Sequence, residues 1–116
     1  MADFIIEKKN FDMQKLNTEL SEQFKLKGID SNNFNKLQLV AEEYLANVLF
    51  PDFEGSVEIS IVNENRELSL IFAHKGTNYI NKMTDSNFLS LKILDNKTKE
   101  IESYTKDSIT FVKFIF

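Results

Sequence analysis

The first half of the chain repeats apolar residues with the period of an α-helix. After a short apolar run at Phe4–Ile6, which is typical of a strand, the apolar positions fall four residues apart, at Leu16, Leu20 and Phe24. Asp12 precedes this segment and Gly28 follows it, and these residue types cap the start and the end of a helix. We therefore expect a strand and then a helix between Asp12 and Gly28.

A second helix is expected from Ser31 to about Phe50. The polar run from Asp30 to Asn33 supplies its cap, and Pro51 stops it. One face of this helix is apolar, which would seat it on a sheet or on a neighbouring helix. The residues of that face are Phe34, Leu37, Ala41, Tyr44, Leu45 and Val48.

The second half of the chain favours strands. Apolar and polar residues alternate from Ser56 to Val62 and again from Leu68 to Phe72, on either side of a turn at Asn63–Arg66, which predicts a β-hairpin. The remaining elements are, in order, a polar irregular segment at 77–87, a short helix at Phe88–Asp95 and a closing hairpin formed by Ile101–Tyr104 and Ile109–Phe116.

The order of elements, β-α-α-β-β-loop-α-β-β, predicts an α+β fold. Helices can cover one face of a mostly antiparallel mixed sheet and form a two-layer sandwich. Only three Gly and one Pro occur and no linker is visible, so residues 1–116 are expected to form a single domain. The Phe-rich run at 111–116 is expected to be a core strand, and the alternative is an exposed edge strand that forms a homodimer.

Composition excludes or disfavours several classes of function. The chain has no Cys, which excludes disulfides and thiolate metal sites, and its single His argues against a zinc site. No apolar run is long enough for a signal peptide or a membrane span, so a cytoplasmic location is expected. The 14 basic and 18 acidic residues are interspersed and give a formal net charge of −4, which disfavours nucleic-acid binding.

Glu43 and Asn47 are the most informative polar pair in the sequence. They lie one turn apart on the predicted helix, opposite its apolar face, where plain solvent surface is expected. Leu39, Val40 and Phe50 flank them, however, and apolar neighbours indicate a second covered surface or a pocket wall. The pair can therefore be an ordinary solvated pair or part of a site.

The segment that carries this pair, Lys36 to Asn47, resembles the N-box helix of the histidine-kinase-like ATPases. The closest similarity is to the branch that contains the anti-sigma-factor serine kinases, and the order of elements along nearly the whole chain is similar as well. The resemblance implies that Glu43 is the catalytic base and that Asn47 binds Mg²⁺ against the phosphates of ATP. A carboxylate suits the first role, and an amide oxygen suits the second.

Two other motifs of that family are altered in this chain. The Asp-x-Gly motif, whose Asp accepts the adenine amino group, corresponds to His74-Lys75-Gly76, so His74 and Gly76 are the implied nucleotide-binding residues. A neutral imidazole nitrogen can accept that hydrogen bond. The Gly-rich stretch that approaches the phosphates corresponds to Asp85–Leu91, which contains no Gly. The phosphate half of the site is therefore depleted.

Three hypotheses about function follow. The first is a regulatory ATP-binding domain, resembling an anti-sigma-factor kinase, that acts on a partner regulatory protein such as a sigma factor or an anti-anti-sigma-like protein. The second is a catalytically inactive member of the same fold that works by binding a protein. The third is a structural or dimerisation module without a pocket ligand.

Overall fold

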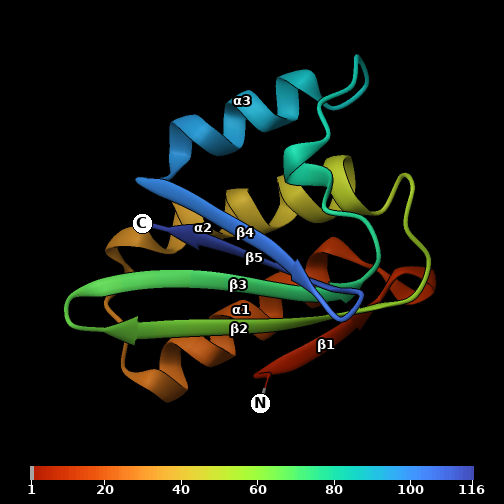
Figure 1. The fold of residues 1–116 in the computed structure, drawn as a ribbon. Helices are drawn as coiled ribbons and strands as arrows, with labels where there is room; N and C mark the ends of the chain where they lie inside the picture. The colour runs from red at the N-terminus through yellow and green to blue at the C-terminus, as the bar shows by residue number, and fades with distance from the viewer. Residues whose placement is uncertain (1) are drawn as a thin grey trace.

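The computed structural model describes residues 2–116, which form one five-stranded sheet with helices on one face (Figure 1). The strands are β1 (Phe4–Glu7), β2 (Ser56–Glu64), β3 (Glu67–Lys75), β4 (Glu100–Lys106) and β5 (Ile109–Ile115). They lie in the order β1-β2-β3-β5-β4, and each neighbouring pair is antiparallel. The two-layer α+β sandwich is confirmed, and its described strands form no parallel pair.

Three main helices make up the second layer. They are α1 (Met13–Lys27), α2 (Phe34–Glu43), which continues directly into the π-helical segment η3 (Tyr44–Leu49), and α3 (Phe88–Lys97). Three short 3₁₀ turns complete the elements, η1 (Lys8–Asn10), η2 (Ser31–Asn33) and η4 (Tyr79–Asn81). Because α2 contacts both α1 and α3, it forms the centre of the helical layer (Figure 1).

The predicted caps of α1 are confirmed. The side chain of Asp12 accepts a hydrogen bond of 2.8 Å from the backbone N–H of Gln14, and Gly28 ends the helix in the left-handed conformation with φ +63°. Asp30 caps η2 in the same way, because its side chain accepts from the N–H of Asn32. These local signals fix where the chain enters and leaves the helical layer.

The hydrophobic core lies between the sheet and the helices, and its centre is aromatic. The inward strand positions are buried at Ile6, Val57, Ile59, Ile61, Leu68, Leu70, Phe72, Val112 and Phe114. Tyr44 at the end of α2 is fully buried, and its ring centre lies 4.7 Å from that of Phe72 and 5.4 Å from that of Phe114. The helix that carries Glu43 is therefore fixed to the middle of the sheet.

The Phe-rich strand β5 lies inside the sheet, between β3 and β4, which confirms the prediction of a core strand. The two edges of the sheet are β1 and β4. The sheet face away from the helices carries Tyr104, whose ring stacks on Phe111 at 5.0 Å. No helix within residues 2–116 is long and apolar enough to cross a membrane.

Both hairpin turns use residues with positive φ. Asn65 and Arg66 join β2 to β3 with φ of 52° and 65°, and Asp107 and Ser108 join β4 to β5 with φ of 55° and 67°. Two-residue turns of this kind match the twist of the strands but favour glycine, especially at the second position. Arg66 and Ser108 therefore hold a backbone conformation that glycine would adopt at lower cost.

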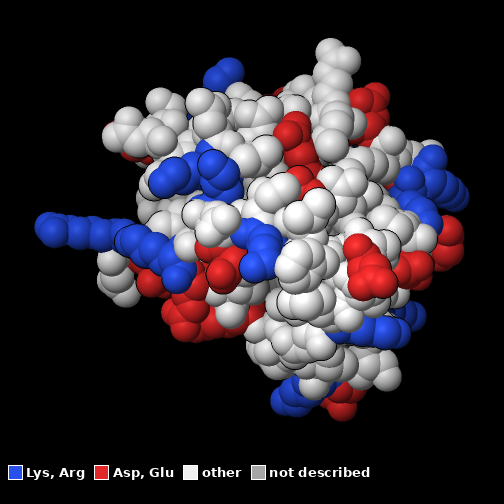
Figure 2. Space-filling model, turned by 90° about the horizontal axis from the view of Figure 1, so that it is seen from above, with Lys and Arg blue, Asp and Glu red and all other residues white. Residues whose placement is uncertain are grey.

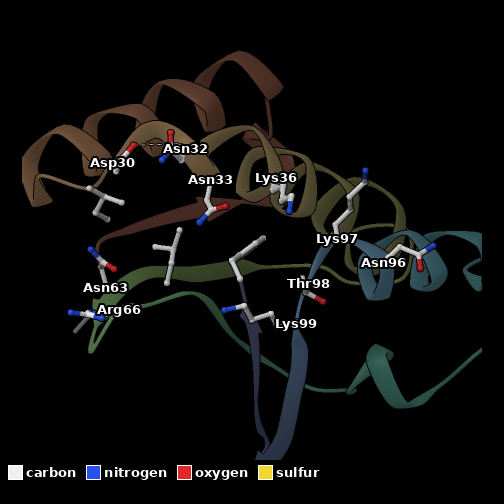
Figure 3. Close-up of a pocket in the computed structure, with 13 residues that line it drawn as sticks. Asp30, Asn32, Asn33, Lys36, Asn63, Arg66, Asn96, Lys97, Thr98 and Lys99 are labelled. Atoms are coloured by element: carbon white, nitrogen blue, oxygen red, sulfur yellow. Dashed lines mark hydrogen bonds between the residues drawn. The ribbon is translucent and has the colours of Figure 1, made fainter.

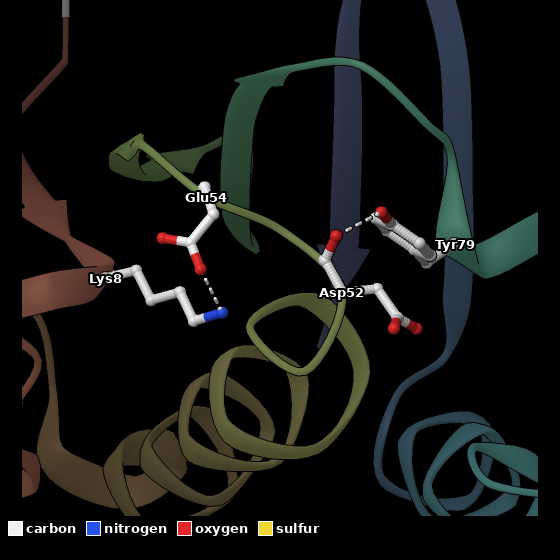
Figure 4. Close-up of polar contacts among 4 residues, drawn as sticks. All are labelled: Lys8, Asp52, Glu54 and Tyr79. Carbon is white, nitrogen blue, oxygen red and sulfur yellow. Dashed lines mark hydrogen bonds and ion pairs between the residues drawn. The ribbon is translucent and has the colours of Figure 1, made fainter.

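The segment at 77–87, expected to be an irregular loop, is held to the body of the protein by hydrogen bonds. Figure 4 shows Tyr79, whose hydroxyl donates to the backbone oxygen of Asp52 at 3.1 Å, beside the ion pair between Lys8 and Glu54 at 2.9 Å. The side-chain amide of Asn78 also donates to Ser103 Oγ at 3.0 Å. These contacts fasten both the segment and the connection between η3 and β2.

Candidate functional site

Glu43 and Asn47, which the sequence singled out, are in contact. Glu43 is half-buried near the end of α2, and Asn47 is exposed on η3. The side-chain nitrogen of Asn47 donates to Glu43 Oε2 at 2.6 Å, and the hydroxyl of Ser90 on α3 donates to the same oxygen at 2.7 Å. One carboxylate oxygen thus accepts two hydrogen bonds, one within its own helix and one from the neighbouring helix.

The apolar residues that flank the pair differ in burial, since Leu39 is 38% exposed and Phe50 packs on Phe11 and Phe53. Val40 and Phe50 are buried, and α3 packs against α2 and η3. Ser90 is itself 9% exposed, and Leu94, one turn further along α3, is fully buried. The second covered surface expected beside Glu43 and Asn47 is therefore the contact between α2 and α3.

The helix that carries Glu43 and Asn47 changes from α-helical to π-helical geometry directly after Glu43. From Tyr44 onward the backbone adopts π-helical hydrogen bonding, as in the bond of 2.9 Å from the N–H of Phe50 to the oxygen of Leu45. Such segments are rare and occur often at functional positions. Here the wider turn accompanies the burial of Tyr44, Leu45, Val48 and Leu49, while Asn47 stays exposed.

His74, the implied adenine-binding residue, is buried at the end of β3, with 3% of its surface exposed. Its Nδ1 lies 2.9 Å from the backbone oxygen of Lys75, and its Nε2 lies 3.2 Å from the hydroxyl of Tyr44. A carbonyl oxygen can only accept, so Nδ1 carries the proton, and the Tyr44 hydroxyl donates to Nε2. Both ring nitrogens are therefore already paired within the protein.

Burial controls the ionisation of this pair. Desolvation lowers the pKa of His74, and the hydrogen bond to the backbone of Lys75 opposes that effect only in part. Burial likewise raises the pKa of the Tyr44 hydroxyl above its usual value, with a smaller contribution from Tyr79. Both groups are neutral at physiological pH, as a buried hydrogen-bonded pair requires.

Gly76 lies just beyond β3, and both of its backbone polar groups are also paired. Its N–H donates to the oxygen of Ser108 at 2.9 Å, and its own oxygen accepts from the hydroxyl of Thr110. Its φ of +94° requires glycine, although a Cβ at this position would meet nothing within 4 Å. The position is thus constrained by backbone conformation and not by lack of space.

The four predicted site residues fall into two groups. Glu43 and Asn47 bond to each other, and Glu43 also bonds to α3, whereas His74 and Gly76 lie at the end of β3, where His74 contacts Tyr44. The hydrogen bond to Glu43 uses the side-chain nitrogen of Asn47, which leaves the amide oxygen as the atom suited to Mg²⁺. Within residues 2–116 no cluster of three or more His, Cys, Asp or Glu could hold a metal ion.

Ser90 is the residue of this site that the sequence did not single out. It lies within Asp85–Leu91, and a buried Ser on a short helix has no pattern of apolar neighbours that would mark it in the sequence. A scan of protein-family models finds none that matches the chain, and a search of curated proteins finds no significant similarity.

Proposed function

We propose that this domain is a regulatory protein-binding module without catalytic activity, in which Glu43 stabilises the fold. The observation that supports this most directly is the double hydrogen bond to Glu43 Oε2 from Asn47 and Ser90. One oxygen of a carboxylate in the position implied for a base thereby takes part in joining α2 to α3. General-base catalysis instead needs a carboxylate within hydrogen-bond reach of the group that it deprotonates.

The surroundings of Glu43 support the same proposal. Phosphoryl transfer depends on positioning and on charge stabilisation around the phosphates. The stretch implied for phosphate contact has no Gly and runs into α3, which packs on α2. The acceptor implied for adenine, Nε2 of His74, already accepts from Tyr44.

The outer side of α3 is the surface that we assign to the partner. Leu89 and Ile93 lie one turn apart on this helix and are 72% and 37% exposed, while Ser90 and Leu94 are buried on its other side. The face of the molecule that includes α3 shows a largely uncharged central area between scattered basic and acidic side chains (Figure 2). Exposed apolar residues on one helix face, rimmed by charge, are typical of surfaces that bind the apolar groove of another protein.

The test compares three immobilised forms of the domain, each incubated with a cell extract. Wild type, the double variant Leu89→Ser/Ile93→Ser and the control Leu26→Ser are exposed to the same extract, and retained proteins are compared by quantitative mass spectrometry. Leu26 is a suitable control because it is 79% exposed, on α1, far along the chain from α3. We expect a protein that wild type and the control retain and the double variant loses. If all three forms retain the same proteins in equal amounts, α3 is not the binding surface.

A second candidate function is the binding of ATP with Mg²⁺, which the resemblance implies. The observation in its favour is that Asn47 is exposed, one turn from Glu43, with its amide oxygen available. Calorimetric titration with ATP and Mg²⁺ at high protein concentration separates the two candidates. A heat of binding that is present in wild type and lost in Asn47→Ala would favour nucleotide binding. The absence of any heat of binding in wild type would eliminate nucleotide binding.

A further inference from the structure

A hollow of about 410 Å³ lies at the opposite end of α2 from Asn47 (Figure 3). Four separate parts of the chain line it: the entrance to α2, the β2–β3 turn, the connection from α3 to β4, and Phe116 after β5. Its size is within the range of small-molecule sites, which runs from about 300 to 1,000 Å³.

The side chains around this hollow are strongly basic, although the whole chain is acidic. Four cations line it, Lys36, Arg66, Lys97 and Lys99, against one carboxylate, Asp30. Four positive charges less one negative charge give a formal sum of +3, in a chain whose formal net charge is −4. The side chains of the hollow therefore carry a local excess of positive charge, which favours an anionic ligand.

These cations are not used by the protein's own ion pairs. The ion pairs formed within residues 2–116 use other basic residues, Lys8, Lys9 and Lys27. The one carboxylate of the hollow, Asp30, accepts a hydrogen bond of 3.0 Å from the N–H of Asn32, which holds it at the start of η2. No contact within the fold accounts for the gathering of positive charge.

The directions of the side chains suit a bound anion. In Figure 3, Asn33 and Lys36 point from the helical layer towards the sheet, and Lys99 points towards the β2–β3 turn that carries Arg66. Asn33, Lys36 and Lys99 thus approach one space from different elements, whereas Lys97 and Asn96 point away from it. Guanidinium and ammonium groups are the side chains that most often bind phosphate, the first by paired hydrogen bonds and the second as a point charge.

One wall of the hollow is apolar. Leu68 and Phe116 are 5% and 8% exposed, and Ile29 is half-buried beside them. An inorganic anion gains nothing from contact with apolar side chains, whereas an organic phosphate can pack its carbon skeleton against them.

The turn that carries Arg66 provides a matched control for testing the role of its side chain. Arg66 has a φ of 65°, a conformation that costs a non-glycine residue stability. Ser108 has nearly the same φ of 67° in the other hairpin and does not line the hollow. The two positions therefore share backbone strain but differ in contact with the hollow, which makes them a matched pair for experiment.

We propose that this hollow binds a small organic phosphate with two or more negative charges, through Lys36, Arg66 and Lys99 against the Phe116 wall. The hollow includes the last residues of α3, Asn96 and Lys97, but neither Glu43 nor the exposed residues Leu89 and Ile93, so it is separate from the surface assigned to the partner above. The oxygens of the phosphate accept hydrogen bonds from the three cations, and Asn33 donates a further bond from its side-chain amide.

The test is a titration of ¹⁵N-labelled protein with ADP and, separately, with inorganic pyrophosphate at low ionic strength, followed by amide chemical shifts. Wild type, Arg66→Gly and Ser108→Gly are compared. Both glycine variants relieve the same strain, so both are expected to fold at least as well as wild type. We expect shifts at residues 29–36, 63–68 and 96–99, tighter binding of ADP than of pyrophosphate, and affinity at least about fivefold lower in Arg66→Gly only.

Three outcomes would overturn the proposal. The first is an absence of shifts in these segments up to millimolar ligand, and the second is equal affinity in Arg66→Gly and Ser108→Gly. The third is a set of shifts confined to Glu43–Asn47, which would support the ATP site instead. Equal affinities for ADP and pyrophosphate would remove the role assigned to the apolar wall.

Discussion

Removal of the Ser90 hydroxyl tests whether Glu43 is structural or catalytic. In Ser90→Ala, the carboxylate keeps its bond to Asn47 but loses the 2.7 Å bond that joins α2 to α3. A hydrogen bond to a charged group contributes about 1.5–3 kcal/mol, and the partial exposure of Glu43 favours the lower part of that range. We expect the free energy of unfolding to fall by about 1.5–2 kcal/mol.

The expected change in melting temperature follows from the size of the domain. The entropy of unfolding is about 2.1 cal/mol/K per residue, which for 116 residues gives about 0.24 kcal/mol/K. A loss of 1.5–2 kcal/mol therefore corresponds to a decrease of about 6–8 °C. Thermal and urea unfolding followed by circular dichroism would measure it. Ser86→Ala is the matched control, because the hydroxyl of Ser86 bonds only to exposed Thr84, and its loss should cost less than about 0.5 kcal/mol.

Glu43→Gln completes the test. The amide still accepts a hydrogen bond but lacks the charge, and charge-assisted bonds are roughly twice as strong as neutral ones, so we expect a loss of about 1 kcal/mol. Ser90→Ala should then cost less in the Glu43→Gln background than in wild type, because the two side chains are coupled. A catalytic base behaves differently, since replacing an active-site group often leaves stability unchanged or raises it. A Glu43→Gln protein as stable as wild type would refute the structural role.

Three further predictions concern other parts of the fold. Burial holds the pKa of His74 below its usual value of 6.5, so as the pH falls the unfolded chain takes up this proton at a higher pH than the folded protein does. The free energy of unfolding should therefore decrease below about pH 6.5, by up to about 1.4 kcal/mol per pH unit. His74→Gln should flatten this dependence in urea titrations between pH 7.5 and 5.5, and an unaltered slope would contradict it. Tyr44→Phe leaves Nε2 of His74 buried without a donor and should cost about 1–3 kcal/mol by urea unfolding, so a cost below about 0.5 kcal/mol would argue against the bond. Asp12→Ala removes the N-terminal cap of α1 and should lower the free energy of unfolding by about 1 kcal/mol. A lower melting temperature would show this loss, and an unchanged melting temperature would contradict the prediction.

Local features of the sequence predicted the elements well because local chemistry sets them. Asp12 and Gly28 are residue types that favour the start and the end of a helix, and the alternation in Ser56–Val62 and Leu68–Phe72 places successive side chains on opposite faces of the sheet. β2 and β4 are longer than expected, whereas β3 ends near His74–Gly76 as expected. The first hairpin turn narrows to Asn65 and Arg66, because strand pairing extends until the backbone must reverse. The π-helical segment after Glu43 has no simple signal in sequence, since it depends on packing of the completed core.

The candidate site was harder to predict because its contacts join distant parts of the chain. Glu43 and Asn47 share a turn, so their proximity followed from helix geometry. The donor that fixes Glu43, however, lies 47 residues away on Ser90, and the partner of His74 is Tyr44, 30 residues before it. Sequence spacing cannot supply such pairings, and the basic hollow at the other end of α2 depends on segments that are still further apart.

The pairing of β1 with β2 has a consequence for the timing of synthesis. Phe4 lies opposite Ile59, so 55 residues separate the two partners along the chain. At about 5–20 residues per second, the ribosome takes roughly 3–11 s to add that length. During this interval α1 and α2 can form from local contacts, while β1 has no strand to join. The backbone groups of β1 that pair with β2 therefore stay without that partner until β2 has been made.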